Sequence, residues 1–471
     1  MIILLLAGLA VAWYLSHYAK QRCLIIDREK TIGGCHRVRR VNGFFSEHGP
    51  RIYSDAYVNA LALLNDMGID FFKMFTRYTF GLVGIGRDVV YEMYFAEILA
   101  FVKVFLWSEY ISQEYAKSTT MKEFMKSYNF SDKTFDTIDR VCQLTDGAGA
   151  ERYTLFEFLQ LLDQNVLYQI YQPKSPNDVG LFPAWEKALL KTGKVDIVLD
   201  THITNIIDHS NMGRGNSNII VSSKTGQTFS CRKGIILAIP PKPLVSLNTP
   251  NLSYLKDWEI HNRYDVYIPI IFHYDSKFHI DNRYGSLDRS DWGIAYIIMT
   301  NHTNFENPQS KTVITTCITN TKRKSKFTGK TADESNREEL VKETLRQLRQ
   351  VYPDLPDPTV SIVSPGIFKS ENGKQWDTID DSYIRPVEQK KPFIDFKLSD
   401  RLWTVGTHTG HHYYDFTSME SAVTNGLFLC KTLYPTTDFP TPKKPIQLST
   451  VLLIVVLIVF LLCFFAYFRY F

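Results

Sequence analysis

An unbroken run of 18 apolar residues, 451–468, lies near the end of the chain and limits what that end can fold into. At about 1.5 Å rise per residue, a helix of this length reaches roughly 27 Å, close to the hydrocarbon thickness of a bilayer. A buried helix of a soluble protein rarely lacks polar residues over such a length. The run therefore predicts one membrane-spanning helix, with the lipid bilayer as its partner.

The residues around this run predict how it is attached and oriented. Lys443 and Lys444 precede it and only Arg469 follows, so the positive-inside rule places the main domain in the cytosol. The proline-rich stretch 434–445 predicts an extended spacer between that domain and the anchor. The first 15 residues are also apolar, but no basic segment precedes them. We favour a buried helix there, with a second membrane segment as the alternative.

Composition excludes several classes of protein. A chain of 471 residues suits two or three interleaved domains, and a net charge of +4 gives no reason to expect nucleic-acid binding. The seven cysteines are scattered, odd in number and without a CxxC pair, which argues against a disulfide framework or a structural zinc site. The histidines at 408, 411 and 412 have only Asp415 nearby, so we expect no metal.

The first 34 residues follow the order of a dinucleotide-binding unit. Such a unit needs a strand, a glycine loop, a helix and a second strand that ends in an acid. A helix is predicted from about Ala7, with Gly8 in its first turn, and a second strand at 23–26 ends in Asp27. An acid there accepts hydrogen bonds from ribose hydroxyls. The pair Gly33 and Gly34 follows.

Later segments, in order, complete a known pattern. They are LFPAWEKALL at 181–190, VDIVLDTHITNI at 195–206, IILAIPP at 235–241, RLWTVGTHT at 401–409 and MESAVTNG at 419–426. With the opening unit, these segments resemble the flavin-containing amine oxidase superfamily, which includes monoamine, polyamine and protoporphyrinogen oxidases. The resemblance spans nearly all of residues 1–435.

The resemblance implies a mixed α/β and α+β fold, in which a Rossmann-like FAD-binding domain is interleaved with a helical and mixed-sheet substrate domain. The FAD-binding parts are 1–55, with its first strand missing or truncated, 181–250 and 366–434. The substrate-domain parts are helical at 56–180 and sheet and helix at 251–365. A proline-rich linker, 435–448, and a transmembrane anchor, 449–468, complete the chain.

The resemblance also implies a non-covalent FAD and a set of site residues. The predicted cofactor-binding residues are Gly8, Asp27, Gly33, Gly34, Gly49, Ile203, Gly406, Met419, Glu420 and Ala422. The catalytic residue is unknown, and the candidates near the flavin are Arg51, His408, Tyr413, Tyr414 and Ser418.

The glycine loop departs from the family pattern. Aligning Ala7 and Gly8 on its end puts Ile3 and Leu5 on the two earlier glycines and the first strand ahead of Met1. Bulky side chains at these positions obstruct a pyrophosphate, so we expect FAD binding to be weak or lost. Cys35 replaces the arginine that follows the glycine pair.

The substrate side departs as well. The family carries a lysine in the strand that matches 266–274, where this chain has none, and Ser418 replaces a tyrosine. Tyr413 and Tyr414 are candidates to compensate for that tyrosine. The stretch 417–420 predicts a capping box that opens a helix, whose N-terminus suits the edge of an anionic flavin.

Two hypotheses of function follow. The first is a membrane-anchored FAD-dependent oxidoreductase of the amine oxidase type, which transfers hydride from a small-molecule substrate to flavin N5. The second is a catalytically inactive, membrane-anchored relative that serves as a scaffold or binding surface.

Overall fold

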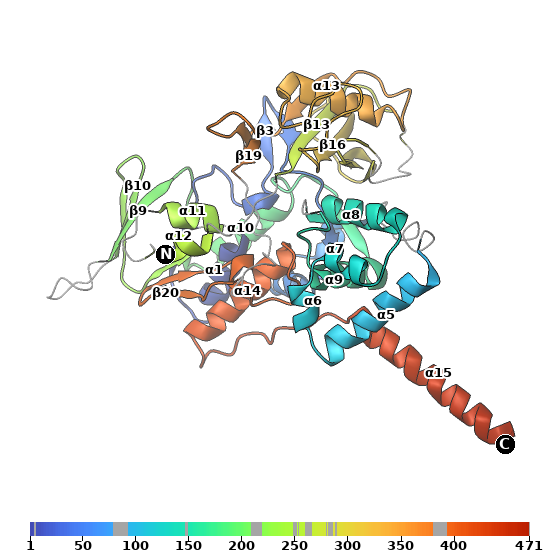
Figure 1. Ribbon diagram of the computed structural model, residues 1–471. Coiled ribbons are helices and arrows are strands. Elements are labelled where there is room, and N and C mark those ends of the chain that lie inside the picture. The colour runs from blue at the N-terminus through green and yellow to red at the C-terminus, as the bar shows by residue number, and fades with distance from the viewer. Residues whose placement is uncertain are drawn as a thin grey trace.

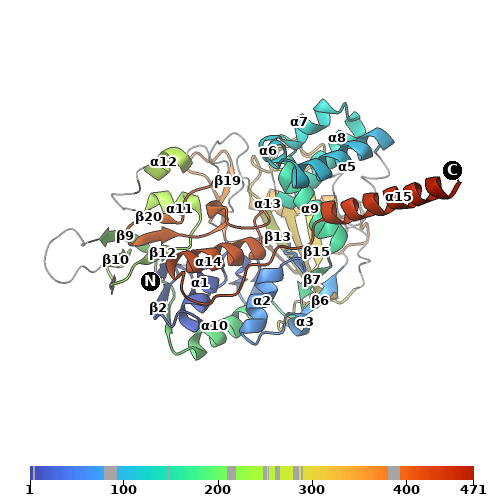
Figure 2. The same cartoon turned by 90° about the horizontal axis from the view of Figure 1, so that it is seen from below.

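The computed structural model describes residues 1–3, 6–78, 93–146, 149–208, 219–247, 252, 254–259, 266–278, 280, 286–287, 290–379 and 393–470. The chain forms three lobes, and a long C-terminal helix projects away from them beside helices α5 and α9 (Figures 1 and 2). One lobe is built on a parallel sheet, the second on an antiparallel sheet with helix α13, and the third on helices α5 to α9.

The parallel sheet gathers strands from the whole length of the chain. Its order is β20 (Lys397–Ser399), β21 (Leu402–Thr404), β12 (Ile235–Leu237), β1 (Ile2–Ile3), β2 (Cys23–Ile26) and β8 (Val195–Val198). Every neighbouring pair is parallel except β20 and β21. Counted along the chain, the parallel strands run in the order 3-2-1-4-5, which is the order of dinucleotide-binding sheets.

The prediction that the first strand lies ahead of Met1 is wrong. β1 lies within the chain, where Ile2 pairs with Ile25 on one side and Ile236 on the other. It is short because helix α1 (Leu6–His17) begins three residues after it. Leu5, predicted to stand at a glycine position, lies outside the described residues. α1 is almost entirely buried, which confirms the buried-helix interpretation of the N-terminus.

Helices α1 and α14 (Met419–Leu433) pack closely against each other behind this sheet. The contact depends on Gly426, because a Cβ there would lie 3.1 Å from the Ala7 carbonyl oxygen and 3.3 Å from Val11 Cγ2. Helix α10 (Leu181–Lys191) packs on the same core through Trp185, which is fully buried. The N-terminal helix α1 is thus held in place by α14, one of the last elements of the domain.

The antiparallel lobe has the strand order β14 (Ser286–Leu287), β15 (Ile294–Ile298), β16 (Thr312–Ile318), β13 (Ile268–Tyr274) and β17 (Val360–Val363). Helix α13 (Arg337–Leu348) packs over it, as Figure 1 shows at the top. Asn336 caps this helix by accepting from the Glu339 amide, while Glu339 reaches back to the Asn336 amide. This reciprocal pairing satisfies two amide donors at the start of the helix.

The helical lobe has its own apolar core. Capping boxes start two of its helices, with Thr120 and Glu123 on one and Thr154 and Glu157 on the other. Its helices are α5 (Phe95–Tyr110), α6 (Glu114–Ser118), α7 (Met121–Ser127), α8 (Asp132–Asp146) and α9 (Leu155–Leu167).

The remaining strands and helices are shorter. The strands are β3 (Arg39–Val41), β4 (Phe44–Ser46), β5 (Tyr53–Ser54), β6 (Phe75–Tyr78), β7 (Ile170–Pro173), β9 (Ile203–Asp208), β10 (Ile219–Ser223), β11 (Thr228–Cys231), β18 (Ile367–Lys369) and β19 (Trp376–Thr378). The helices are α2 (Val58–Asp66), α3 (Phe71–Met74), α11 (Pro241–Ser246) and α12 (Tyr254–Glu259).

Helix α15 (Leu448–Tyr470) is, within the described residues, the one helix that is long and apolar enough to cross a membrane. The segment before it is not a free spacer. Phe439 is buried in the main core, the Lys443 amide donates to Asn59 Oδ1 at 2.7 Å, and the Leu448 amide donates to Asp163 Oδ1 at 2.7 Å. The proline-rich linker is therefore docked on the domain.

Candidate functional site

A groove lies at the carboxyl edge of the parallel sheet. Several strands place the residue that follows or ends them there: Ile3 on β1, Asp27 after β2, Ile239 after β12 and Gly406 after β21. Ligands of open parallel sheets bind at this edge, where the strand order reverses. The groove has two parts, an outer pocket and an inner pocket, and both are lined by Cys35, Ile239 and Pro240.

The outer pocket measures about 150 Å³ and contains the acid predicted at the end of the second strand. Asp27 is buried, and its Oδ2 accepts from Arg37 Nη2 at 2.6 Å. Burial raises the pKa of Asp27 to about 6, while Arg37 lowers it. Ile203 and Thr201 form the opposite wall. Arg37 and the Glu29 amide, which donates to Asp27 Oδ1, each take one acceptor position of this carboxylate, so positions remain for a ligand.

The inner pocket measures about 90 Å³, and two helix N-termini open onto it. Leu6 and Ala7 begin α1, while Ser418 and Met419 begin α14. Free amides and the partial positive charge at such ends attract anions. Arg51 lines the same pocket and donates from Nη2 to the Cys35 carbonyl. The inner pocket is consequently suited to negative charge.

A buried acid lies near Arg51 on the side of the antiparallel lobe. Burial raises the pKa of Glu47 to about 7, while the positive charge of Arg51 and a hydrogen bond from Thr315 lower it. Cys317 is buried nearby, 3.5 Å from where a Cβ on Gly49 would lie. The sequence reasoning did not select Glu47, although it stands in the same short segment as Gly49 and Arg51.

His408 is a buried residue of the inner pocket. Its Nε2 lies 2.8 Å from Thr404 Oγ1, and its ring fills the space above Gly406, where a Cβ would lie 2.7 Å from the ring. Burial lowers the pKa of His408 to about 3, so the ring is neutral at physiological pH. It can position groups by hydrogen bonding but does not supply a positive charge.

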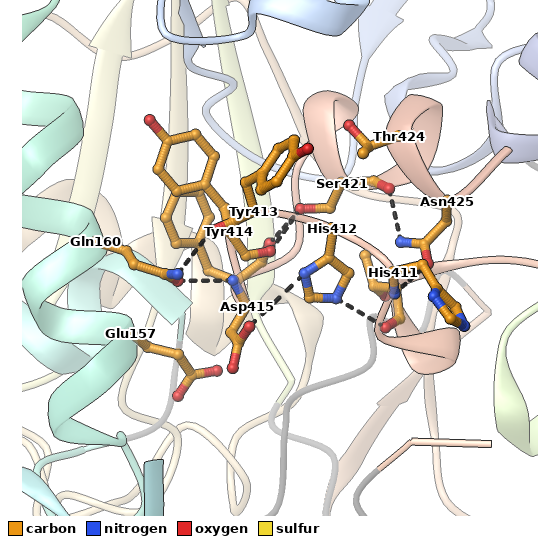
Figure 3. A network of polar contacts seen from close by, with 12 residues as sticks. Glu157, Gln160, His411, His412, Tyr413, Tyr414, Asp415, Ser421, Thr424 and Asn425 are labelled. Carbon is orange, nitrogen blue, oxygen red and sulfur yellow. Dashed lines mark hydrogen bonds and ion pairs between the residues drawn. The ribbon is translucent and has the colours of Figure 1, made fainter. Parts of the chain in front are cut away.

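The other two histidines belong to a polar network around the start of α14 (Figure 3). His411 donates its amide to Asn425 Oδ1 and stacks on Phe396 at 4.2 Å between ring centroids. His412 lies 3.7 Å from Asp415 and 3.2 Å from the Thr407 carbonyl oxygen. Their contacts fix the loop that leads into α14. Gln160 of α9 holds the same loop through the Tyr413 carbonyl and the Asp415 amide.

The structure brings about half of the predicted site residues to the groove. Asp27 and Ile203 line the outer pocket. The inner pocket is lined by Arg51, Gly406, His408, Ser418, Met419 and Ala422. The predicted residues that line neither pocket are Gly8, Gly33, Gly34, Gly49, Tyr413, Tyr414 and Glu420.

The residues outside the groove have structural contacts instead. Gly33 has φ +131°, and a Cβ there would lie 2.6 Å from the Phe182 ring, so the glycine permits α10 to pack. Tyr414 is buried in the main core, where its ring stacks on Phe416 at 4.9 Å.

The predicted capping box at 417–420 is wrong. Ser418 caps α14 by accepting from the Ser421 amide, and Glu420 does not reach back. The Glu420 carboxylate accepts instead from the amides of Asn59 and Ala60, which begin α2. The N-termini of α14 and α2 thus lie together, and the Glu420 carboxylate accepts from the first amides of α2 instead of those of α14.

Three further residues line the groove. Cys35, which replaces the arginine after the glycine pair, lines both pockets, and Thr201, which the sequence did not single out, lines the outer one. Arg37, a candidate from the sequence to reach a phosphate, forms an ion pair with Asp27 in the outer pocket. In the sequence, only their positions indicate that they belong to the groove: they lie just after the glycine pair or just after a strand. No residue type there marks a ligand contact by itself.

The fold and the groove define a protein of the dinucleotide-binding class with a second, substrate-type lobe. A family model described as flavin containing amine oxidoreductase matches residues 6–431. The chain therefore belongs to the flavin-containing amine oxidoreductase family, as its motifs predicted, and FAD is the cofactor that this family implies.

Solved structures with the same fold are distant in sequence. A putative protoporphyrinogen oxidase from Exiguobacterium sp. 255-15 is 14% identical, with a TM-score of 0.60 over 92% of this chain and 97% of that chain. A putrescine oxidase bound to putrescine is 13% identical, with a TM-score of 0.62 over 92% and 98%. An oxidoreductase from Methanosarcina mazei is 12% identical, with a TM-score of 0.61 over 91% and 99%. No curated protein sequence matches the chain.

Proposed function

We propose that this protein is a membrane-anchored, FAD-dependent oxidoreductase of the amine oxidase type. One observation carries the proposal: the groove runs from an acid at the end of β2, past the N-terminus of α1, to the N-terminus of α14. That succession suits the adenosine, the pyrophosphate and the flavin ring of one extended dinucleotide. When bound, FAD would accept a hydride from a C–H bond of the substrate.

The ends of the groove fit FAD better than its middle. Asp27 and Ile203 would hold the adenosine, and the amides of α14 beside Met419 and Ala422 would hold the flavin edge. In the middle, Leu6 and Ala7 stand where a glycine loop would let backbone amides approach phosphate. Both pockets are also smaller than the roughly 300 to 1,000 Å³ of common ligand sites. Binding of a whole dinucleotide therefore requires the pockets to widen.

The residues of the inner pocket have separate roles in this proposal. Arg51 and the start of α14 stabilise negative charge that develops on the ring edge facing them. His408 stays neutral and is held in place by its contact with Thr404 at the end of β21. Arg51 also disfavours a protonated amine at this end, which agrees with the missing lysine and tyrosine. Simple monoamines are accordingly proposed to be poor substrates.

The proposal places the main domain on the cytosolic side of a bilayer crossed by α15. The most apolar 18-residue window within Leu448–Tyr467 has a mean hydropathy of 3.2, and the large apolar side chains from Ile454 to Tyr467 are about half exposed or more. At about 1.5 Å per residue, the 20 residues of Leu448–Tyr467 span roughly 30 Å, the thickness of the hydrocarbon core. The lysines at 443 and 444 support the orientation.

Calorimetry with FAD tests the cofactor proposal. Losing two or three phosphate hydrogen bonds at about 1.5 kcal/mol each moves a nanomolar affinity to about the micromolar range. We expect the detergent-solubilised full chain to bind one FAD in that range and Leu6→Ala to bind more tightly. Asp27→Ala should weaken binding, whereas Asp196→Ala, an exposed acid on neighbouring β8, should not.

A second candidate function, an inactive scaffold, is favoured by the closed Asp27–Arg37 ion pair and the small pockets. Under this candidate the fold is kept while the groove stays filled by its own side chains. Absence of FAD binding by both the full chain and Leu6→Ala would support the scaffold and exclude the oxidoreductase.

A further inference from the structure

Helix α5 exposes a row of large side chains along one face. Phe95, Leu99, Lys103 and Trp107 of α5 recur every fourth residue, with Ile111 just after its end, and so follow a ridge that is inclined to the helix axis. The four apolar members are 74%, 49%, 46% and 66% exposed in that order. We call these five residues the α5 face. Four large apolar side chains exposed along one ridge are a surface feature typical of an interaction site.

The α5 face cannot be turned inward, because the opposite side of the helix is already occupied. Ala100, Phe101, Val104 and Phe105 are buried in the core of the helical lobe. The capping interaction of Glu97 fixes the start of the helix, since its carboxylate accepts from the Tyr94 amide at 2.7 Å. The side chains of the α5 face therefore stay exposed in the folded helical lobe.

The helix lies across the base of α15 (Figures 1 and 2). Tyr110 Oη donates to Thr450 Oγ1 at 3.2 Å, and Lys444 Nζ lies 2.7 Å from Glu109 Oε1. Leu448 and Leu452 of α15 pack against the same helical core as α5. The end of the α5 face is thus tied to the first turn of the proposed membrane span.

We propose that the α5 face lies in the headgroup region of the bilayer that α15 crosses. The inference rests on the proposed membrane anchor and goes beyond it, because it gives the domain a second contact with lipid and a fixed orientation. A span that enters the hydrocarbon just after Thr450 brings the membrane surface to the level of Tyr110.

The chemistry of the row favours lipid as the occupant. Tryptophan and other aromatic side chains collect at membrane interfaces, and an apolar helix face lies in the plane of that interface. Lys103, in the middle of the row, can extend its ammonium group toward lipid phosphate while its methylenes stay in the apolar layer. Continuity with α15 distinguishes this surface from a protein-docking site elsewhere on the molecule.

Fluorescence quenching by brominated lipids tests the proposal with the full chain in vesicles. Trp107 is 46% exposed, whereas Trp185 and Trp292 are fully buried. Lipids brominated near the headgroup end of the acyl chain should quench the wild type, and Trp107→Phe should lose most of that quenching. Lipids brominated near the chain end should quench Trp107 less than the shallow ones do.

A second experiment measures whether a new tryptophan on the α5 face restores the quenching. In the Trp107→Phe background, Leu99→Trp should restore shallow quenching. The control, Phe327→Trp, places tryptophan at a position that is 75% exposed in the antiparallel lobe and should restore none.

Flotation after carbonate extraction separates the two proposals. If the full chain fails to float with vesicles, the anchor proposal fails. If it floats but Trp107→Phe is quenched like the wild type and Leu99→Trp adds nothing, the anchor holds and the α5 face is not in the membrane.

Discussion

Buried carboxylates join distant parts of this chain. Glu420 of α14 accepts from the first amides of α2 and from Asn59 Nδ2 at 2.6 Å. Asp163 of α9 accepts from the Leu448 amide at the start of α15. Asp27 pairs with Arg37 in the groove. The partners of Glu420 and Asp163 are far away in sequence, whereas Arg37 lies only ten residues after Asp27.

The Glu420→Ala variant should be strongly destabilised. It removes the acceptor of two buried backbone amides and one side-chain amide, and each unsatisfied buried donor costs about 1 to 3 kcal/mol. We expect the free energy of unfolding to fall by about 3 kcal/mol, measured by denaturant titration. The matched control is Glu338→Ala, an exposed acid in the first turn of α13, which should change it by less than about 0.5 kcal/mol.

The Asp163→Asn variant should remove a pH dependence of stability. Burial raises the pKa of Asp163 from 3.8 to about 7, so the folded state binds a proton more tightly than the unfolded state. Its stabilising contribution is complete below pH 4 and is lost as pH rises through 7. Asparagine still accepts from the Leu448 amide but does not titrate.

At pH 8 we expect Asp163→Asn to be more stable than the wild type by about 3 kcal/mol. Near pH 4 the two should melt alike. Thermal unfolding in detergent across this range is the measurement. A constant difference between the two proteins at every pH would contradict the assignment of the titration to Asp163.

At the scale of elements, the contact between α1 and α14 organises the parallel-sheet lobe. The helices approach closely because small residues face each other: Gly426 on one side, Ala7 and Ala10 on the other. The N-termini of the same two helices open onto the inner pocket. Their distance therefore sets the width of the candidate cofactor site as well as the packing of the core.

The Gly426→Val variant should separate these helices. Its Cβ would lie 3.1 Å from the Ala7 carbonyl oxygen, a backbone atom that cannot rotate away. Overpacking of this kind costs about 1 to 3 kcal/mol, and we expect the upper part of that range in the free energy of unfolding. Thr432→Val, at an exposed position of the same helix, is the control and should stay near the wild type.

Elements were easier to predict from the sequence than contacts between them. The strand at Cys23–Ile26, the helix with Gly8 in its first turn and the apolar C-terminal helix follow from hydrophobic pattern and glycine position alone. The two-residue strand β1 was misplaced, because so short a strand has no periodicity and exists only through pairing with β2 and β12. The capping role predicted for Glu420 was wrong for a similar reason. The capping pattern in the sequence does not reveal that the N-terminus of α2 lies beside Glu420 in the fold.

In the whole molecule, the segment before α15 ties the anchor to the two lobes beside it. Phe439 joins the main core, Asn59 bonds Lys443 through both its amide group and its carbonyl oxygen, and Tyr168 Oη donates to the Ile446 carbonyl at 3.0 Å. An undocked linker would let the domain tumble above the membrane. A docked one holds the α5 face and the groove in a fixed relation to α15.

Two truncations compare the docked segment with the anchor. A chain ending at Gln447 lacks α15 but keeps the docked segment, whereas a chain ending at Tyr434 lacks both. We expect carbonate extraction to release both, since α15 is the proposed span. The shorter chain should be less stable by about 3 to 5 kcal/mol, because it loses the burial of Phe439 and the hydrogen bonds of Asn59. Equal unfolding midpoints would show that the docked segment adds nothing, and a longer chain that resists extraction would show that α15 is not the sole attachment.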